Sequence, residues 1–401
     1  MCIRDSSITN IHQYSMVRNN IFFIIESSFP EYTGGIENWL WNVSVRLADK
    51  FNVYIISESP SIYREPFYSI PSSIKILRYP TWRRNPIIRF LLRGKLRKFE
   101  ILYHSQSINK ILKANVRDPS SSILFALGTI TPSSASLQYK KTDSDILYVS
   151  SSRGPHAQVA ANAIPSLKKY FFNEEKKNMV NADIVLVNGY DTLKYYESFG
   201  IKGEVLLNGV DVTKLETLKD NNPYDENSKI IVSVGSLLDI KGVNELIKAF
   251  SFVKPVIKDV KLYFVGKGDP SKYQRLANAL GVAKDIVFVG NKNNVAPYLQ
   301  YANIATCLSG GGGFSMAALE AMASKTPIVA WDTDVYRQFN STVHTMELVE
   351  YNNVEQLGRK IREMLLDLPK YKRMGVDANN YARQFDWKNV ITNMINILEN
   401  K

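Results

Sequence analysis

The sequence contains few residues of the kinds that bind metals or form disulfides. Its 401 residues include two cysteines, Cys2 and Cys307, and four histidines. Two cysteines provide no disulfide framework, which suits a reducing cytoplasm. Because the four histidines are scattered, a site built on cysteine and histidine is unexpected. We therefore predict no metal.

Long apolar runs and short cofactor motifs are also lacking. Apolar candidates such as "IFFII" (21–25) and "DIVLV" (183–187) have only the length of strands, whereas a membrane-spanning helix needs about 20 residues. We expect no membrane span and recognise no secretory signal. No G-x-G-x-x-G motif follows the first strand of either half, which argues against a Rossmann oxidoreductase. Residues 1–15 resemble neither an anchor nor a strand, and we interpret them as a non-native or disordered leader.

Positive charge is abundant and unevenly distributed. The net charge is +12, and residues 1–200 hold 25 basic and 16 acidic side chains. Much of the excess lies in residues 78–100, where basic side chains are mixed with a tryptophan and large aliphatics. A solvated helix face with a loop would explain this segment, and so would docking on anionic lipid headgroups. No nucleic-acid module accompanies the charge, so we expect no nucleic acid. The eight basic residues are Arg78, Arg83, Arg84, Arg89, Arg93, Lys95, Arg97 and Lys98.

The hydrophobic pattern predicts two α/β units. From residue 20 onward, short β-rich runs such as "NIFFIIESS" alternate with helical segments such as "GIENWLWNVSVRLADK". After the polar stretch 218–229 the same rhythm restarts with "IIVSVGS" and "GVNELIKAFSFVKP". Such alternation with short connections favours parallel sheets covered by helices. Ligands in such sheets bind where strands end and loops lead into helices.

Two of these loops carry residues suited to an anion. Gly34 and Gly35 come after the first strand and before a helix, where backbone N–H groups can approach an anion. A plain flexible turn is the alternative for this pair. Lys241 lies at another strand-to-helix junction and can reach a phosphate as a point charge, but taken alone it is better explained by exposure to solvent.

The stretch "SGGGGFSMAALEAMA" (309–323) is the strongest local signal. Its glycines permit close backbone approach, Ser315 is suited to cap the following helix, and the helix start offers N–H groups to a diphosphate. Glu320 lies among small apolar side chains on that helix. A buried carboxylate needs hydrogen-bond donors. These would come either from a ribose diol or from N–H groups of a neighbouring loop.

Several segments together resemble the retaining glycosyltransferases of family 4. They are "GGIE" (34–37), "LLNGVD" (206–211), "VGSLLDIKG" (234–242), "YFVGKG" (263–268) and "SGGGGFSMAALEAMASKTPIVA" (309–330), with the closing "YARQFDWKNVITNMINILEN". The resemblance covers most of residues 20–400. It implies a GT-B fold, in which two Rossmann-like domains of parallel sheets covered by helices face each other across a cleft.

The resemblance also implies a division of the chain. Residues 16–205 would form the acceptor-binding domain, 206–380 the nucleotide-sugar-binding domain, and 381–401 a helix that crosses back to the first. Such enzymes transfer a sugar with retention from a nucleotide-diphosphate sugar and generally need no metal or other cofactor. The acceptor would be a glycan, a lipid-linked molecule or another hydroxyl compound.

Residue roles carry over only where the motifs match. Glu320 falls on the acid that typically holds the ribose, and Lys241 falls on the lysine that grips the donor diphosphate. Gly312 replaces the acid that usually contacts the transferred sugar, and Ser236 replaces the usual arginine. The backbone from Gly313 through Phe314 and Ser315 to Met316 would then hold the phosphates together with Lys241 and the pair Gly34–Gly35.

A further catalytic position follows the strand-like run "DILYVSSS". The family often has a histidine there, and the matching residue here is either Arg153 or His156. We interpret the acidic triplets 143–145 and 332–334 as loop acids rather than metal ligands. A non-catalytic nucleotide-sugar-binding relative or partner subunit is the alternative function. The protein is expected in the cytoplasm, with peripheral attachment to the inner face of the membrane through the basic segment.

Overall fold

The computed structural model describes most of the chain in two compact units. The described residues are 18–32, 34–60, 65–80, 96–154, 156–217, 221–224, 227–292, 294–310 and 314–400. One unit contains the described chain up to Ser151, Ala157–Val185 and the end of the chain from Met394; the other contains Ser152–His156 and Leu186–Asn393. The predicted leader 1–15 and the basic residues Arg83, Arg84, Arg89, Arg93 and Lys95 lie outside the described residues.

The first sheet has seven strands in the order β3-β2-β1-β4-β5-β6-β7. Their bounds are β1 Asn20–Ile25, β2 Asn52–Glu58, β3 Ile74–Tyr79, β4 Ser122–Leu127, β5 Leu147–Ser152, β6 Ile184–Val187 and β7 Glu204–Val205. β1 pairs in parallel with both β2 and β4. The central strands are apolar along most of their length because helices cover both faces of a parallel sheet. The strand order reverses at β1, which makes the carboxyl end of β1 a natural ligand position.

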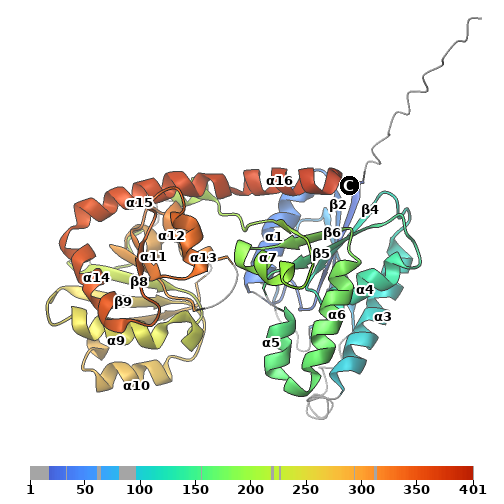
Figure 1. Cartoon of the computed structure of the whole chain (residues 1–401). Helices are drawn as coiled ribbons and strands as arrows, with labels where there is room; N and C mark the ends of the chain where they lie inside the picture. Colours follow the sequence, from blue (N-terminus) through green and yellow to red (C-terminus); the bar gives the residue numbers. More distant parts are fainter. Residues whose placement is uncertain are drawn as a thin grey trace, which may run out of the picture. The chain divides into compact units, whose positions relative to one another are not determined.

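Helices pack against both faces of the first sheet (Figure 1). They are α1 Gly35–Leu47, α3 Arg97–Asn115, α4 Thr131–Lys140, α5 His156–Ala163, α6 Lys168–Val180 and α7 Tyr190–Glu197. On one face, Phe22 and Leu124 pack with Ile108 of α3 and Ala135 of α4. On the other face, Trp39 of α1 stacks on Phe125 with a centroid distance of 5.9 Å. These alternating contacts bury both surfaces of the strands.

The second sheet has six strands in the order β10-β9-β8-β11-β12-β13. The strands are β8 Lys229–Val234, β9 Val260–Val265, β10 Ile286–Gly290, β11 Ile304–Cys307, β12 Ile328–Trp331 and β13 Glu347–Val349. All of their pairings are parallel. β8 lies between β9 and β11, so the strand order reverses there. By the same rule as in the first sheet, the carboxyl ends of β8 and β11 flank a natural ligand position.

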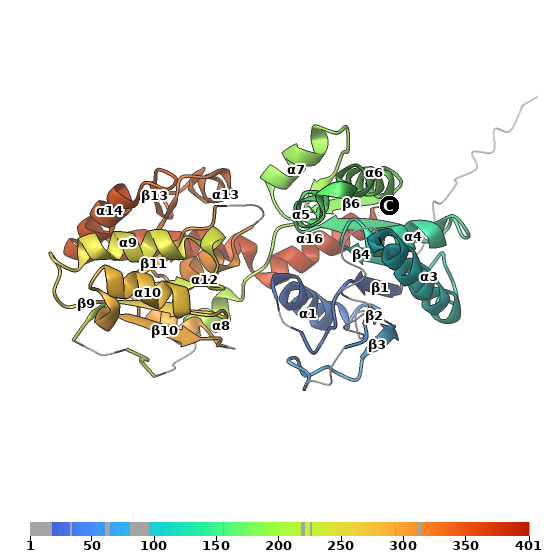
Figure 2. The same cartoon turned by 90° about the horizontal axis from the view of Figure 1, so that it is seen from below.

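The second sheet is also covered on both faces (Figures 1 and 2). Its helices are α8 Val212–Thr217, α9 Val243–Val253, α10 Ser271–Ala279, α11 Ala296–Gln300, α12 Met316–Ala323, α13 Asp334–Arg337, α14 Val354–Leu366 and α15 Leu368–Ala382. The last helix, α16 Trp387–Glu399, belongs to the first unit from Met394 onward. Helices α9, α10 and α14 share one buried cluster with the sheet, and α12 packs into the cluster on the other face. The predicted architecture of two parallel-sheet units covered by helices is confirmed.

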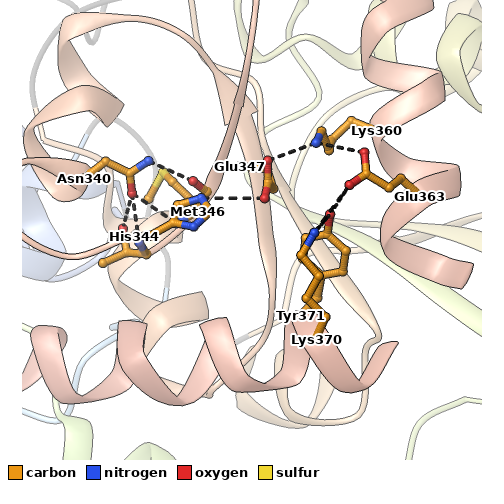
Figure 3. A network of polar contacts seen from close by, with 9 residues as sticks. Asn340, His344, Met346, Glu347, Lys360, Glu363, Lys370 and Tyr371 are labelled. Carbon is orange, nitrogen blue, oxygen red and sulfur yellow. Dashed lines mark hydrogen bonds and ion pairs between the residues drawn. The ribbon is translucent and has the colours of Figure 1, made fainter. Parts of the chain in front are cut away.

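A polar network ties the edge strand β13 to two helices (Figure 3). Lys360 of α14 contacts Glu347 of β13 at 3.1 Å and Glu363 at 2.9 Å. Tyr371 of α15 donates its hydroxyl to Glu363 at 2.5 Å. Asn340 holds the chain just before β13 through the backbone of Met346. Charged side chains on an edge strand also discourage pairing with a second sheet.

Two arginines of the basic segment form ion pairs with carboxylates. Arg78 lies in β3 rather than on a helix, and its Nη2 donates to both Glu31 oxygens at 2.6 and 2.8 Å. Arg97, which begins α3, is bound by Glu26 and Glu100. Burial by itself lowers the pKa of Arg97, but these two carboxylates raise it above its ordinary value. Arg78 and Arg97 therefore do not fit the predicted lipid-facing role.

Lys98 is the remaining described member of that segment. Its ammonium lies 4.8 Å from the centre of the Tyr170 ring, a cation–π contact. In the described part of the chain, no helix combines the length and the apolar character needed to cross a membrane.

Candidate functional site

The loop after β8 presents Lys241 toward the end of β11. Lys241 closes a short 3-10 turn, Asp239–Lys241, and its Nζ contacts Ser309 Oγ at 3.3 Å. The next residue, Gly242, has φ 72°, and a Cβ there would lie 2.5 Å from Leu308 Cβ and 2.7 Å from Leu308 O. Only glycine tolerates both the left-handed backbone and this approach. Gly242 therefore lets the lysine-bearing loop pack directly on the chain that leads into the glycine tract.

Lys241 has no acidic partner in the described parts of the chain. Its ammonium contacts the Ser309 hydroxyl, and no described carboxylate lies within ion-pair distance of it. Desolvation lowers the pKa of Lys241, with a smaller opposing effect from Cys307. By its accessible surface Lys241 is exposed, so an anionic ligand can reach this cation, which no described acid neutralises.

The start of α12 is braced by Tyr336. Ser315 is the N-cap of α12, as predicted, and its Oγ accepts a hydrogen bond from Ala318 N at 3.3 Å. The buried Tyr336 hydroxyl accepts from Ser309 N at 3.2 Å. Burial raises the pKa of Tyr336, so this hydroxyl stays protonated, while contacts with Ser315 and Ser309 oppose the rise. Tyr336 thus holds the two ends of the glycine tract.

Glu320 is a desolvated carboxyl group without a hydrogen-bond donor among the described residues. Burial raises the pKa of Glu320 to about 7. No described side chain or backbone N–H donates to its carboxylate. The alternative that Glu320 satisfies N–H groups of a neighbouring loop is therefore not seen in the described structure. Its unmet need for donors suits a ligand that carries hydroxyl groups.

Cys307, the last residue of β11, senses the charge of both Lys241 and Glu320. Burial raises the pKa of Cys307 to about 12; Lys241 lowers it and Glu320 raises it. Lys241 and Glu320 thus both act electrostatically on the same thiol at the end of β11. The thiol itself remains neutral and serves as an apolar wall.

The other residues that the sequence predicts to bind the donor lie at different kinds of position. Phe314 is buried and its ring packs against Phe339 and Phe385 at 5.0 and 5.6 Å, which leaves only its backbone for a ligand. Met316 begins α12. Ser236 accepts a backbone bond from Leu238 N at 2.9 Å. Gly312 and Gly313 lie outside the described residues.

Gly34 and Gly35 begin α1 in the first unit. Gly34 is the N-cap of α1, and a Cβ there would lie 2.6 Å from Glu37 Oε2. The buried Glu37 carboxylate thus faces the helix start, so this N-terminus already has an acid of the protein beside it. Gly35 is exposed, with no atom within 4 Å of the position of a Cβ. This arrangement favours the turn interpretation over an anion site.

Arg153 and His156 are neighbours after β5. His156 Nε2 accepts from Arg153 N at 3.3 Å. The Arg153 guanidinium donates to Asn208 Oδ1 at 2.9 Å and to Leu206 O at 3.3 Å. Burial lowers the pKa of Arg153 to about 9. The two alternatives for one catalytic position are therefore in direct contact, and the arginine side chain packs on residues 206–208.

The acids of the triplet 332–334 bind an arginine. Asp332 and Asp334 contact Arg337 at 2.6 and 3.2 Å. Within the described ranges, no group of three or more histidine, cysteine or acidic side chains is arranged to hold a metal ion.

Much of the second unit is similar to a known protein family. Residues 215–381 match the family model "Glycosyl transferases group 1". This segment is similar to that family, and it includes Ser236, Lys241 and Glu320.

Curated relatives agree with this assignment. An uncharacterised glycosyltransferase of Methanocaldococcus jannaschii is 25% identical over 264 residues, which cover 65% of this chain and 70% of that protein. With other relatives the chain spans about half of their length.

Solved structures match nearly the whole chain. Sucrose-phosphate synthase from Thermosynechococcus elongatus is 18% identical, has a TM-score of 0.79, and covers 96% of this chain and 99% of its own. The Anabaena HepE protein, solved in complex with UDP-glucose, is 14% identical with a TM-score of 0.72, covering 95% and 100%. At these identities the likeness concerns the fold alone. It confirms the predicted GT-B fold, with one parallel sheet in each of the two units.

Sequence reasoning missed three residues that shape the site. Cys307 interacts electrostatically with both charged groups, Ser309 contacts Lys241, and Tyr336 accepts a hydrogen bond from Ser309 N. Ser309 and Cys307 could have been found, because they end the strand before the glycines. Tyr336 lies far along the chain, and no local pattern marks it.

Proposed function

We propose that the protein is a retaining glycosyltransferase that moves a sugar from a nucleotide-diphosphate sugar to a hydroxyl acceptor. The match of residues 215–381 to glycosyl transferases group 1 supports the reaction class. The similar HepE protein was solved with UDP-glucose bound, and by analogy we propose a nucleotide sugar as the donor here.

One observation carries the proposal. Lys241 lacks an acidic partner and Glu320 lacks a donor among the described residues, and both act on Cys307 at the end of β11. A nucleoside diphosphate meets both needs, because its phosphates are anionic and its ribose carries two adjacent hydroxyl groups. A structural ion pair between Lys241 and Glu320 would have removed this argument, but neither residue forms one in the described structure.

The proposed chemistry follows from where charge develops. As the bond to the sugar breaks, negative charge grows on the leaving diphosphate. Lys241 and the N–H groups at the start of α12 would stabilise this charge as fixed donors. We propose that these groups suffice without a metal ion. Because Ser236 replaces the usual arginine, a single ammonium would neutralise the phosphates.

The acceptor and the location are also part of the proposal. A glycan, a lipid-linked molecule or another hydroxyl compound would be accepted, in the cytoplasm or at the inner face of the membrane. Arg153 or His156 would face the reacting carbon.

A thermal-shift screen against UDP, GDP, ADP, their common sugars and NAD(P) tests the proposal. We expect the parent protein to be stabilised by one nucleoside diphosphate and its sugar, and Lys241→Met to lose most of this shift. Lys248→Met, an exposed lysine on α9, is the matched control. Stabilisation by NAD(P) alone would overturn the assignment.

A non-catalytic relative is the alternative, motivated by the loss of the usual residues at 236 and 312. Such a protein would bind the nucleotide sugar but release no nucleoside diphosphate. Incubation of the identified donor with a panel of glycoside acceptors, followed by nucleotide chromatography, separates the two. Product anomers seen by NMR then test retention, and activity in EDTA tests metal independence.

A further inference from the structure

Two buried polar atoms at the carboxyl ends of strands in the first sheet have no hydrogen-bond partner among the described residues. Glu58, the last residue of β2, is 6% exposed. Its Oε1 is buried, and no donor in the described parts of the chain reaches it; the same holds for Ser27 Oγ, just beyond β1. The two residues are neighbours, since Glu58 N donates to Ser27 O at 3.1 Å. Both lie at the carboxyl ends of adjacent parallel strands.

Arg78, which contacts the backbone of Glu58, is already used by other groups. Arg78 Nη1 donates to Ser57 Oγ at 2.9 Å and to the Glu58 backbone O at 3.0 Å. Its Nη2 binds both oxygens of Glu31. Arg78 therefore braces the backbone at Glu58 without neutralising the Glu58 carboxylate.

A further hydrogen bond joins this part of the sheet to the loop after β1. Ser57 Oγ donates to Phe29 O at 3.0 Å, which joins β2 to the loop after β1. The carboxylate thus stays unpaired within the described structure although its surroundings are well ordered by hydrogen bonds. A buried polar group without a partner is costly, and native proteins retain few of them. A bound ligand that supplies donors would explain why the group is retained.

We propose that Glu58 and Ser27 bind hydroxyl groups of a polyhydroxylated acceptor, such as the terminal sugar of a glycan. The proposal rests on the proposed function and names the acceptor class and its contact residues. A carboxylate oxygen accepts from a sugar hydroxyl, and the serine hydroxyl can donate or accept. The carboxyl edge of this sheet is where a ligand is expected in such folds. No described cluster of metal-ligating side chains favours a metal here instead.

Measurements of the Tm give the first test. Substitution of a ligand-binding group leaves the Tm level or raises it, whereas substitution of a structural group lowers it. In Glu58→Gln and Glu58→Leu, the Tm of the ligand-free protein should stay level or rise by roughly 2–4 °C. Glu31→Gln, which breaks a formed ion pair, should lower the Tm. Glu65→Gln, an exposed acid of the same unit, serves as the neutral control. A clear fall of the Tm in both Glu58 variants would assign Glu58 a structural role and overturn the proposal.

Binding gives the second test. Methyl glycosides of glucose, galactose, mannose and N-acetylglucosamine are titrated into the full chain, with and without the nucleoside diphosphate, and followed by saturation-transfer NMR. We expect one of them to bind, and Glu58→Leu to weaken it roughly ten- to hundredfold. Ser27→Ala should weaken it less, since a neutral partner is lost. The proposal fails if no glycoside binds or if glycoside binding is unaltered in Glu58→Leu. It also fails if the diamine 1,4-diaminobutane, titrated in the same way, binds while no glycoside does.

These outcomes are separable from a failure of the proposed function. If the parent binds the nucleoside diphosphate through Lys241 but Glu58→Leu leaves glycoside binding intact, only the acceptor site is wrong. If no nucleotide binds at all, the transferase assignment fails first.

Discussion

The ammonium group of Lys241 lies 3.3 Å from the hydroxyl of Ser309. This contact joins the loop after β8 to the loop after β11, the two strands at which the order of the second sheet reverses. It places a cation without a described acidic partner beside the start of α12. We expect the donor diphosphate to take the place of the serine hydroxyl as the main partner of the ammonium.

Removing this ammonium should impair transfer more than folding. We expect Lys241→Ala to lower kcat/KM by roughly 10²- to 10³-fold, the usual effect of losing one preorganised donor. Steady-state assays of nucleotide release check this, with Lys248→Ala as the control. Activity equal to the parent in purified Lys241→Ala would refute the role of the lysine.

Glu320 should make stability depend on pH. Because the folded protein raises the pKa of Glu320 to about 7, the folded state holds its proton over a range where the unfolded chain has lost it. The contribution of Glu320 to the free energy of unfolding is therefore fully present below the ordinary pKa of a glutamate, and it is lost as pH rises toward 7. Glu320→Gln should become more stable relative to the parent over that window, by roughly 1–3 kcal/mol. Urea titrations at pH 5 and 8 measure the difference; equal differences at both would contradict the assignment.

The same carboxyl should govern nucleotide affinity in the opposite direction. Its ionised form is the better acceptor for ribose hydroxyls, so binding of the nucleoside diphosphate should strengthen as pH rises through about 7. Glu320→Gln should bind more weakly and lose this dependence. Calorimetric titration at several pH values checks it, with Lys241→Ala to separate the contribution of the ammonium.

Gly242 offers a paired test of backbone geometry. Gly242 and Gly281 have nearly the same φ, 72° and 73°, but a Cβ would clash with Leu308 only at Gly242 and would meet nothing within 4 Å at Gly281. We expect Gly281→Ala to cost about 1 kcal/mol of unfolding free energy from the left-handed backbone alone. Gly242→Ala should cost roughly 2–4 kcal/mol and also weaken nucleotide binding. Similar values for the two variants would show that the close approach to Leu308 does not matter.

The network at β13 should contribute to stability in a salt-dependent way. Lys360 is 23% exposed and contacts two carboxylates; although burial alone lowers the pKa of Lys360, Glu363 and Glu347 raise it overall. Lys360→Met should lower the free energy of unfolding by roughly 1–2 kcal/mol, with a smaller loss at high salt. Lys370→Met, at an exposed contact of 3.7 Å to Glu363, should change it by less than about 0.5 kcal/mol. Denaturation in urea at two salt concentrations distinguishes them.

Much of the fold could be predicted from local patterns. The β-rich run before "GIENWL" becomes β1, the restart after the polar stretch 218–229 becomes β8 and α9, and Ser315 caps α12. These features depend on periodicity and on backbone chemistry within a few residues, so a single sequence contains enough information. The short edge strand β13 was not predicted, because three residues carry too little periodicity.

The sequence by itself determined the alternating α/β layout, the glycine-rich turn before a helix, and the presence of Lys241 and Glu320 at loop and helix positions. Tertiary structure alone decided which charges stay unpaired. Arg78 and Arg97, equal to their basic neighbours in the sequence, are neutralised by Glu31 and by Glu26 with Glu100, whereas Lys241, Glu320 and Glu58 find no partner of opposite charge or donor in the described structure. The reason is physical: pairing requires two groups within a few ångströms, and residues far apart in the chain reach that distance only through the packing of the sheets.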